Sequence, residues 1–499
     1  PFAGGPFKVN TTLKAWRAKT KRAAVSSFGF SGTNAHMVFE EAPKDFLKPS
    51  PPRSRHLVVV SARTAEQLRT VTQNLSAHCR SGADLGHLAF TLLMGRDHQA
   101  HRLAFIVSNL SELEDKLNHW LSGAAVADQW QGEVDNGGIR QQAALRSQGN
   151  DAINASDLES VAALYVQGYR LDYVKLFGPG FRRVPLPLYP FSKERYWVEH
   201  EARPLTQPQP TTQAAPSQTE THEKTVTLIK ELVAETLRVP SAEINTAEPL
   251  ESYGVDSILV VQLTDNLRRH FDGVSSTLLF EVQTIDGLVE SLLEKELKSV
   301  PAEVRKVEYK ATDIAIIGMA GRYPQAPDLD TFWKNLKDGR NCITEIPKSR
   351  WDWQAFYDAE KGTPGKSYTK WGGFIDDIDK FDPRFFRISP AEAEYIDPQE
   401  RLFLQSAWNA IEDAGHTPES LSDNKRTGVF VGVMNSLYLP QANHWSIPNR
   451  VSYLFNFNGP SLSVDTACSS SLTAIHLAME GLQSGTCETA IAGGVNLIL

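Results

Sequence analysis

Residues 459–485 read GPSLSVDTACSSSLTAIHLAMEGLQSG, and this stretch decides how the C-terminal part of the chain is interpreted. SLSV is typical of a short strand, and the run that follows the cysteine has the apolar spacing of a helix. Cys468 stands at the junction between the two. A thiol at a helix N-terminus forms the thiolate more readily, so the pattern predicts a reactive cysteine. The alternative is a buried, inert cysteine, which is the commoner fate of this residue type.

Strand-like runs alternate with helical runs on the N-terminal side of this stretch and beyond it. DIAIIGM (313–319), RTGVFVG (426–432) and ETAIAGGV (488–495) are apolar runs typical of buried strands. PQERLFLQSAWNAIEDAG (398–415) has helical spacing. This alternation predicts an α/β sheet covered by helices on both faces.

The first 200 residues also mix strands and helices. HLVVVSA (56–62) and RLAFIVS (102–108) are typical of short buried strands. TAEQLRTVTQNLSAHC (64–79) and SELEDKLNHWLSG (111–123) have helical spacing, and each opens with a Ser or Thr that we expect to be the N-cap. The pattern predicts an α+β domain.

Between these blocks lies a segment with a different pattern. Residues 201–222, rich in Pro, Gln and Thr, predict a flexible tether, and 298–312 predicts a second, charged linker. The residues between them predict a small helical bundle. It contains LESYGVDSILVVQL (250–263), with Asp256 as an expected N-cap and Ser257 in the first turn of a helix.

Ser257 is the candidate attachment site in this bundle. Free backbone N–H groups and the helix dipole at a first turn favour a phosphodiester on that hydroxyl. Ile258 and Val261 lie on the arc away from the expected core, where they are candidates for partner recognition. The alternative is that Asp256 and Ser257 only cap the helix.

Composition excludes several classes of function. The chain has 499 residues, enough for three or four domains, and a net charge of -8, which does not indicate a nucleic-acid surface. No apolar run is long enough for a membrane helix, and no secretory leader is present. The four cysteines have no CxxC spacing, so neither a disulfide framework nor a metal site is predicted, and we expect a cytoplasmic location.

The cysteine stretch resembles a known family. DTACSSSL, DIAIIGMAGRYPQAPDLDTFWKNLKDG and FDPRFFRISPAEAEYIDPQERLFLQSAWNAIEDAG resemble the first half of a polyketide synthase ketosynthase. The resemblance implies a thiolase-like fold, Cys468 as the acyl-accepting nucleophile, and a ketosynthase homodimer in the intact protein. His476 lies roughly 12 Å along the helix axis from Cys468, too far to be its base. The family's two catalytic histidine motifs are not found here, so the fragment alone is expected to be incomplete for condensation.

The N-terminal stretch resembles the opposite end of the same enzyme. SSFGFSGTNAHMVFEEAP (26–43) is similar to the last conserved segment of a ketosynthase, and chain order assigns it to an upstream one. The resemblance implies an active-site loop that contains Phe28, Gly29, Phe30, Gly32 and Asn34. His36 is not one of the family's catalytic histidines, and a structural role is expected for it.

The middle segment resembles acyl carrier proteins, with Ser257 as the residue that bears 4'-phosphopantetheine. This implies a phosphopantetheinyl transferase as a partner. Residues 44–123 resemble the linker subdomain that follows a ketosynthase, and RVPLPLYPFSKERYWVE (183–199) resembles the segment that packs back onto it. No GHSxG nucleophile motif lies between them, which favours loading by a trans-acting malonyl acyltransferase.

The combined expectation is a fragment of a modular type I polyketide synthase, a multidomain chain with neighbouring modules as partners. It comprises α/β thiolase-like ketosynthase pieces, an α+β linker subdomain and an all-α four-helix carrier bundle. Ser257 would hold the acyl chain and pass it to Cys468 for decarboxylative Claisen condensation. The alternatives are a non-catalytic carrier and docking fragment, or part of a fatty-acid or hybrid peptide synthase. The expected boundaries are 1–43, 44–199, 200–222, 223–298, 299–312 and 313–499.

Overall fold

The computed structural model divides the chain into two compact units, which are residues 1–200 together with 309–499, and residues 201–308. The described parts of the first unit are 8–29, 32–43, 48–125, 127–134, 143–198, 313–423, 426–435, 438 and 443–499. Those of the second are 226, 228–234, 241, 244–246, 263, 267, 271 and 284–295. No helix among the described residues is long and apolar enough to cross a membrane.

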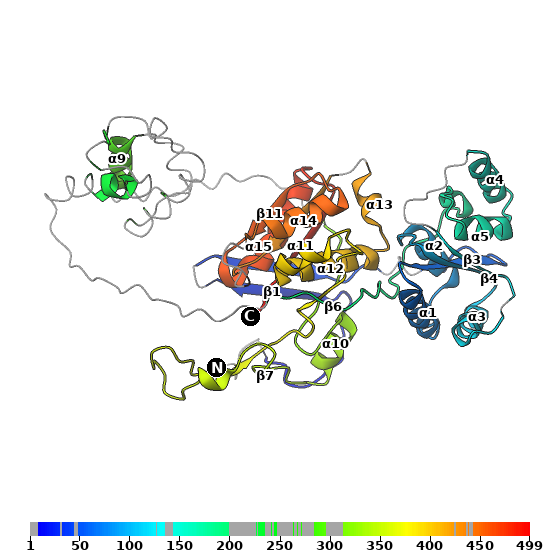
Figure 1. Cartoon of the computed structure of the whole chain (residues 1–499), viewed down its shortest axis with the longest axis horizontal. Helices are drawn as coiled ribbons and strands as arrows, with labels where there is room; N and C mark the ends of the chain where they lie inside the picture. The colour runs from blue at the N-terminus through cyan, green and yellow to red at the C-terminus, as the bar shows by residue number, and fades with distance from the viewer. Residues whose placement is uncertain are drawn as a thin grey trace. The chain divides into compact units, whose positions relative to one another are not determined.

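Residues 48–180 form an antiparallel subdomain around a sheet of order β3-β4-β5 (Figure 1). The strands are β3 (His56–Ala62), β4 (His101–Val107) and β5 (Gln129–Glu133), and around them lie α1 (Ala65–Cys79), α2 (Leu85–Met94), α3 (Leu110–Ser122), α4 (Ala143–Asn154), α5 (Leu158–Val166) and the 3-10 turn η2 (Tyr173–Leu176). Both expected strands and the α+β class of this subdomain are confirmed.

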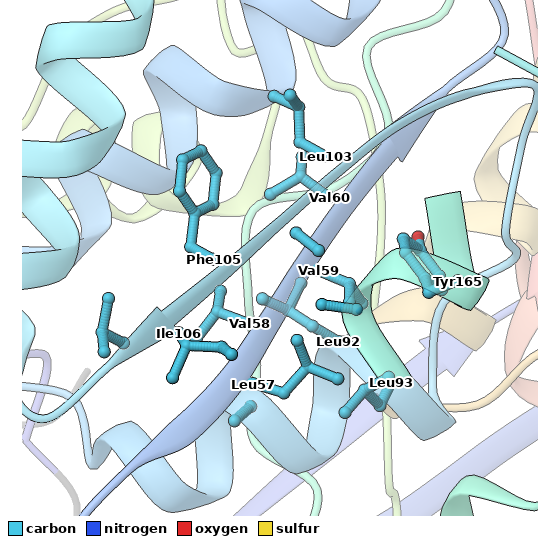
Figure 2. Packing of buried hydrophobic residues seen from close by; sticks show 14 of the residues in the cluster. Leu57, Val58, Val59, Val60, Leu92, Leu93, Leu103, Phe105, Ile106 and Tyr165 are labelled. Atoms are coloured by element: carbon cyan, nitrogen blue, oxygen red, sulfur yellow. The ribbon is translucent and has the colours of Figure 1, made fainter. Parts of the chain in front are cut away.

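The core of this subdomain explains why β3 and β4 are apolar on both faces. Val58, Val59, Leu103, Phe105 and Ile106 are each at most 2% exposed and lie between helices on the two sides of the sheet (Figure 2). A strand that packs on both faces needs continuous rather than alternating apolar residues. The sequence HLVVVSA meets this requirement.

Capping residues set where the helices of this subdomain begin. Thr64 caps α1 as expected, its hydroxyl accepting from the backbone N–H of Gln67 over 3.2 Å. The expectation that Ser111 opens α3 is wrong. The helix begins two residues earlier, and Asn109 is its cap, with its side-chain oxygen accepting from the N–H of Glu112 over 2.9 Å. Asn and Ser are comparable N-caps, so capping chemistry allows the earlier start.

Residues 313–499 form a parallel subdomain with a sheet of order β11-β10-β12. The sheet strands are β10 (Thr427–Gly432), β11 (Ser461–Val464) and β12 (Thr489–Gly494), and the helices are α10 (Leu329–Lys337), α11 (Pro390–Tyr395), α12 (Pro398–Asp413), α13 (Pro418–Ser422), α14 (Ser446–Phe455) and α15 (Ser470–Gln483). Shorter elements are β7 (Thr344–Glu345), η5 (Trp353–Ala355), β8 (Trp371–Gly372), β9 (Lys380–Phe381) and η6 (Ala467–Ser469).

Side chains of the central strand β10 pack on both faces of this sheet. Val429 and Val431 belong to a cluster with α12 and α14, while Phe430 belongs to a separate cluster with Ala474 and Ala478 of α15. Successive residues of a strand point to opposite faces, so one strand joins both cores. The expected sheet with helices on both faces is confirmed.

The apolar run DIAIIGM does not form the expected strand. The structure assigns no strand to residues 313–322, and Ile316, Ile317 and Met319 are 57–61% exposed. The run lies against α12 instead, where the backbone N–H of Met319 donates to Asp413 over 2.9 Å. A strand needs a neighbour for its backbone hydrogen bonds, and no described strand pairs with this run.

An N-terminal hairpin belongs to the same compact unit. Strands β1 (Arg22–Phe28) and β2 (Asn34–Glu40) pair antiparallel with Phe28 opposite Asn34. The hairpin contacts η6 and α15, the elements that carry and follow Cys468. The two stretches that resemble the opposite ends of a ketosynthase therefore meet within one chain.

A crossing segment, residues 183–198, runs from the antiparallel subdomain along the parallel one. Its short strand β6 (Glu194–Arg195) pairs with β9, and the N–H of Tyr189 donates to the carboxylate of Glu412 over 2.8 Å. Farther along, Arg401 donates to the carbonyl oxygen of Tyr196 over 2.7 Å. The segment expected to pack on a ketosynthase thus packs on the C-terminal subdomain of this chain.

The second unit has a small apolar core among its described residues. Ile229, Val233, Leu263, Leu267 and Ile285 are at most 1% exposed and lie in one cluster. The helix α9 (Ile285–Lys295) begins after Thr284, whose hydroxyl accepts from the N–H of Gly287 over 3.2 Å. Helical spacing in this segment predicts inward positions at Val226, Ile229, Val233, Leu237, Leu259, Val260, Leu263, Leu267 and Phe271. Ile229, Val233, Leu263 and Leu267 are buried, and Val226 and Phe271 are half-buried against the same cluster. Leu237, Leu259 and Val260 lie outside the described residues.

Candidate functional site

Cys468 lies on a turn between strand β11 and helix α15, as the sequence predicts. β11 ends at Val464, the 3-10 turn η6 spans Ala467–Ser469, and α15 follows directly. Figure 1 shows α15, β11 and α14 packed together in this part of the molecule. The turn stands at the carboxyl ends of the parallel strands, which is where α/β sheets bind their ligands.

Glycines at the ends of β10 and β12 let the start of α15 come close to the sheet. A Cβ on Gly432 would lie 2.7 Å from the backbone of Ser470 and Ser471, and one on Gly494 would lie 2.0 Å from the Ser471 hydroxyl. Both distances are far inside van der Waals contact. The sheet therefore supports the first turn of α15 directly, and any side chain at these glycines would push the Cys468 turn outward.

Ala467 holds an unusual backbone conformation beside the cysteine. Its φ is +55°, a left-handed value that costs a residue with a Cβ roughly 1–2 kcal/mol. The Asp465 carboxylate accepts a hydrogen bond from the N–H of Ala467 over 3.0 Å and so stabilises this conformation. The strain brings the chain sharply from the strand into the helix. It leaves Cys468 exposed at the outside of the turn.

Hydrogen bonds of side-chain hydroxyls stabilise the Cys468 turn on its inner side. The Ser470 hydroxyl accepts from the N–H of Thr466 over 2.9 Å and donates to the carbonyl oxygen of Ala467 over 2.7 Å. The Ser469 hydroxyl lies 2.8 Å from both oxygens of Thr466, and the Thr466 hydroxyl lies 3.1 Å from that of Thr473. Ser469 and Ser470 are buried. The SSS run has no periodicity that would mark such a network in the sequence.

Two of the other three cysteines lie in environments unlike that of Cys468, and the third, Cys342, is half-buried. Cys79 and Cys487 are buried in the two cores. Burial raises the pKa of the Cys79 thiol to about 11, and it also raises the pKa of Cys487. Both are therefore protonated at neutral pH, and Cys468 is the exposed thiol among the cysteines.

The N-terminal hairpin brings part of its predicted loop to the cysteine. Gly29 is buried, and a Cβ there would lie 2.8 Å from the carbonyl oxygen of Thr466 and 3.1 Å from the Ser469 hydroxyl. Phe28 and Asn34 are exposed, Gly32 has a φ of +93° in the turn, and Phe30 lies outside the described residues. The structure thus places Gly29 directly against the Cys468 turn.

Neither nearby histidine takes a place beside the thiol. His476 lies on an exposed face of α15, with its Nε2 3.4 Å from Glu480 one turn farther on. His36 lies exposed on β2, where its Nδ1 is 2.8 Å from the Ser26 hydroxyl across the hairpin. Both positions agree with the helix-face and structural roles expected for these residues.

The predicted carrier site lies outside the described residues. The structure does not describe the candidate residues Ser257, Asp256, Ile258 and Val261. The described residues around them, Leu263 and Leu267, are fully buried and support a folded core for the segment.

Three family sequence models match separate parts of the chain. The N-terminal domain of β-ketoacyl synthases matches residues 311–499, the ketoacyl-synthetase C-terminal extension matches 1–106, and the phosphopantetheine attachment site matches 227–292. The chain has the domain composition of a modular polyketide synthase. Its ketosynthase and carrier parts make it a multidomain protein. The carrier domain is of the kind that bears covalently attached 4'-phosphopantetheine.

Curated relatives agree with this composition. The chain is 53% identical over 320 residues to polyketide synthase PksM and 44% identical over 333 residues to PksL, both from Bacillus subtilis strain 168. These alignments cover 56% and 55% of the chain but only 8% and 7% of the relatives. The oxazolomycin ketosynthase domain OzmH KS7 of Streptomyces albus is a solved structure that is 50% identical, with a TM-score of 0.35, and the match covers 36% of this chain and 34% of that one.

Proposed function

We propose that this chain serves polyketide chain elongation by an acyl transfer between two sites, with Ser257 as the carrier residue and Cys468 as the acyl acceptor. The observation that carries the proposal is the exposed thiol of Cys468 on a strained turn at the N-terminus of α15. The match of residues 227–292 to the phosphopantetheine attachment family supports the carrier half. The polyketide synthases PksM and PksL support the reaction class.

The chemistry required of Cys468 is transthioesterification. A phosphopantetheine group on the carrier supplies a thiol that presents the acyl chain as a thioester. The Cys468 thiolate attacks the acyl carbonyl carbon, and the new C–S bond forms as the carbonyl π electrons move to oxygen. When the carbonyl re-forms, the C–S bond to the carrier breaks, and the departing carrier thiolate takes a proton from solvent. Backbone N–H groups of the turn would stabilise the negative oxygen while it exists.

The finer parts of the proposal concern partners and boundaries. A phosphopantetheinyl transferase would load Ser257, with Asp256 beside the attached cofactor and Ile258 and Val261 at the recognition surface. The absence of a GHSxG motif between residues 123 and 183 supports a trans-acting malonyl acyltransferase as the source of the extender unit. Domain boundaries near 43, 199, 222, 298 and 312 are part of the same proposal, as is a cytoplasmic location.

Two mass measurements test the proposal. The chain is incubated with coenzyme A and a broad-specificity phosphopantetheinyl transferase, and its intact mass is compared with that of Ser257→Ala. A phosphopantetheine-sized gain in the parent alone is expected, and no gain in folded parent would sink the carrier half.

The acceptor half is tested separately. The chain is incubated with an acyl N-acetylcysteamine thioester, and the acylated peptide is identified by mass spectrometry beside a Cys468→Ala control. Acylation that depends on Cys468 is expected. If the chain is folded and Cys468 is not acylated under these conditions, the carrier has no acyl-accepting site in this chain. The two-site proposal would then fail.

A further inference from the structure

The Ser470 hydroxyl spans the backbone on the inner side of the Cys468 turn. It accepts a hydrogen bond from the N–H of Thr466 over 2.9 Å, and it donates one to the carbonyl oxygen of Ala467 over 2.7 Å. The backbone N–H of Ser470 also bonds to that carbonyl oxygen. The Ala467 carbonyl therefore has two donors from one residue, and Ser470 is buried, so water does not compete for them.

The Ala467 carbonyl belongs to the peptide bond that continues into Cys468. A trans peptide is planar, and its C=O and N–H point in opposite directions. Whatever fixes the direction of the Ala467 carbonyl therefore also fixes the direction of the Cys468 N–H. The hydroxyl of Ser470 turns the carbonyl toward the protein interior and the N–H away from it.

Ala467 precedes this peptide plane and holds a strained backbone conformation. Its left-handed φ of +55° is strained, so relaxation toward an ordinary backbone conformation would rotate the following peptide. The Asp465 carboxylate accepts a hydrogen bond from the N–H of Ala467, and the Ser470 hydroxyl donates one to the carbonyl oxygen of Ala467. The two side chains fix the strained residue from both sides.

We propose that Ser470 is a positioning residue that orients the Cys468 backbone N–H toward the oxygen of the acyl carbonyl during transfer. This inference rests on the proposed acceptor role of Cys468 and adds a named side chain that acts through the backbone. The hydroxyl contacts neither the thiol nor the substrate. Its effect is confined to reactions in which negative charge develops on a carbonyl oxygen beside the turn.

Two reactions of the same thiol separate this role from a general structural one. Acyl transfer from an acyl N-acetylcysteamine thioester develops charge on the carbonyl oxygen and needs the oriented N–H. Alkylation by iodoacetamide displaces iodide from a saturated carbon and develops no such oxyanion. Loss of an oxyanion donor costs about 100–1,000-fold in rate, so a misdirected donor is expected to cost about 10–100-fold.

The experiment measures both rates at Cys468 in the full chain by peptide mass spectrometry for the parent, Ser470→Ala and Ser470→Thr. In Ser470→Ala the acyl-transfer rate is expected to fall about 10–100-fold, while the alkylation rate changes less than about threefold. Ser470→Thr retains the hydroxyl and is expected to recover acyl transfer to within about threefold of the parent. The matched control is Ser484→Ala, the same change at an exposed residue at the opposite end of α15, with both rates expected to stay at parent level.

The outcomes are distinct. Equal loss of both rates in Ser470→Ala, or no loss in either, overturns the proposal. If Ser470→Ala does not fold, as judged by its melting curve, Asp465→Ala tests the same plane, because it removes the hydrogen bond that holds the N–H of Ala467 while Ser470 stays in place. The same selective loss is then expected, and an unchanged ratio of the two rates would overturn the inference. Failure of the proposed function looks different, since the parent itself would then not be acylated.

Discussion

Gln67 donates a hydrogen bond of 3.0 Å to the carboxylate of Asp382, although the two residues lie 315 positions apart in the sequence. The same carboxylate oxygen accepts from the N–H of Ser192 in the crossing segment over 2.9 Å. Asp382 is 4% exposed. One buried side chain therefore joins α1 of the antiparallel subdomain, the crossing segment and the parallel subdomain.

Replacing Asp382 by alanine is expected to loosen this junction. The change leaves the donors of Gln67 and Ser192 without their charged acceptor, and a buried hydrogen bond to a charged group contributes about 1.5–3 kcal/mol. Asp382→Ala should lower the free energy of unfolding by about 2–4 kcal/mol in a urea titration. Asp115→Ala, the same change at an exposed site on α3, is the control and should stay within about 0.5 kcal/mol of the parent. Equal urea midpoints for Asp382→Ala and Asp115→Ala would contradict a stabilising role of Asp382 at this junction.

Replacing Gly29 by alanine is expected to disturb the cysteine site from the opposite end of the chain. The added methyl would lie 2.6 Å from the Thr33 carbonyl oxygen and 2.8 Å from that of Thr466, so the hairpin or the Cys468 turn must move. Displacement of a reacting group by about 1 Å costs up to about 100-fold in rate, and we expect acyl transfer to Cys468 to fall at least about tenfold. Gly178→Ala, where nothing lies within 4 Å of the added atom, should keep the parent rate. A parent-like rate in Gly29→Ala would mean that the hairpin does not hold this turn.

The cysteines are expected to differ in reactivity. Because burial raises the pKa of Cys79 to about 11 and also that of Cys487, both remain thiols near pH 7.5. Limiting iodoacetamide should therefore alkylate Cys468 before either buried cysteine, as read by peptide mass spectrometry. Addition of urea should abolish the preference by exposing all the thiols. Early labelling of Cys79 in the folded chain would contradict the burial described above.

The buried environment of His98 predicts that the free energy of unfolding depends on pH. It lines a cavity of about 40 Å³ that Arg96 and Glu412 also line, its Nε2 lies 3.1 Å from the Leu93 carbonyl oxygen and its Nδ1 lies 3.2 Å from the Tyr165 hydroxyl. Desolvation, followed by the nearby Arg102 cation, lowers the pKa of His98 to about 3 from 6.5. The folded state therefore keeps His98 neutral, while the unfolded state takes up a proton below pH 6.5. Stability present above that pH is lost progressively as the pH falls toward 3.

The size of this effect is measurable between pH 7 and pH 5. Over this range His98 should cost at most about 2 kcal/mol of stability. Urea titrations of the parent and of His98→Gln at both values isolate the contribution, because the carboxylates titrate equally in the two proteins. The parent should lose about 2 kcal/mol more than the variant on acidification. Parallel losses would show that His98 is not kept neutral by the fold.

The local sequence determined most of the secondary structure. Thr64 marks the start of α1, the run HLVVVSA marks β3, and SLSV before Cys468 marks β11, because capping and period depend on residues close together in the chain. Cys468 was predicted at a strand-to-helix junction for the same reason. The start of α3 was misplaced by two residues because Asn109 and Ser111 are both able caps, and capping preference alone does not choose between them.

Tertiary structure alone decided which distant surfaces meet. The resemblance implied that Gly29 belongs to an active-site loop, but the local sequence does not indicate that this loop lies against Thr466, 437 positions farther along the same chain. The run at 313–319 is as apolar as β3, yet it is not a strand here, because ladder hydrogen bonds require a partner strand that local sequence does not specify. Residue types and spacing thus predicted a cysteine at a strand-to-helix junction, and long-range packing decided that the N-terminal hairpin lies against that junction.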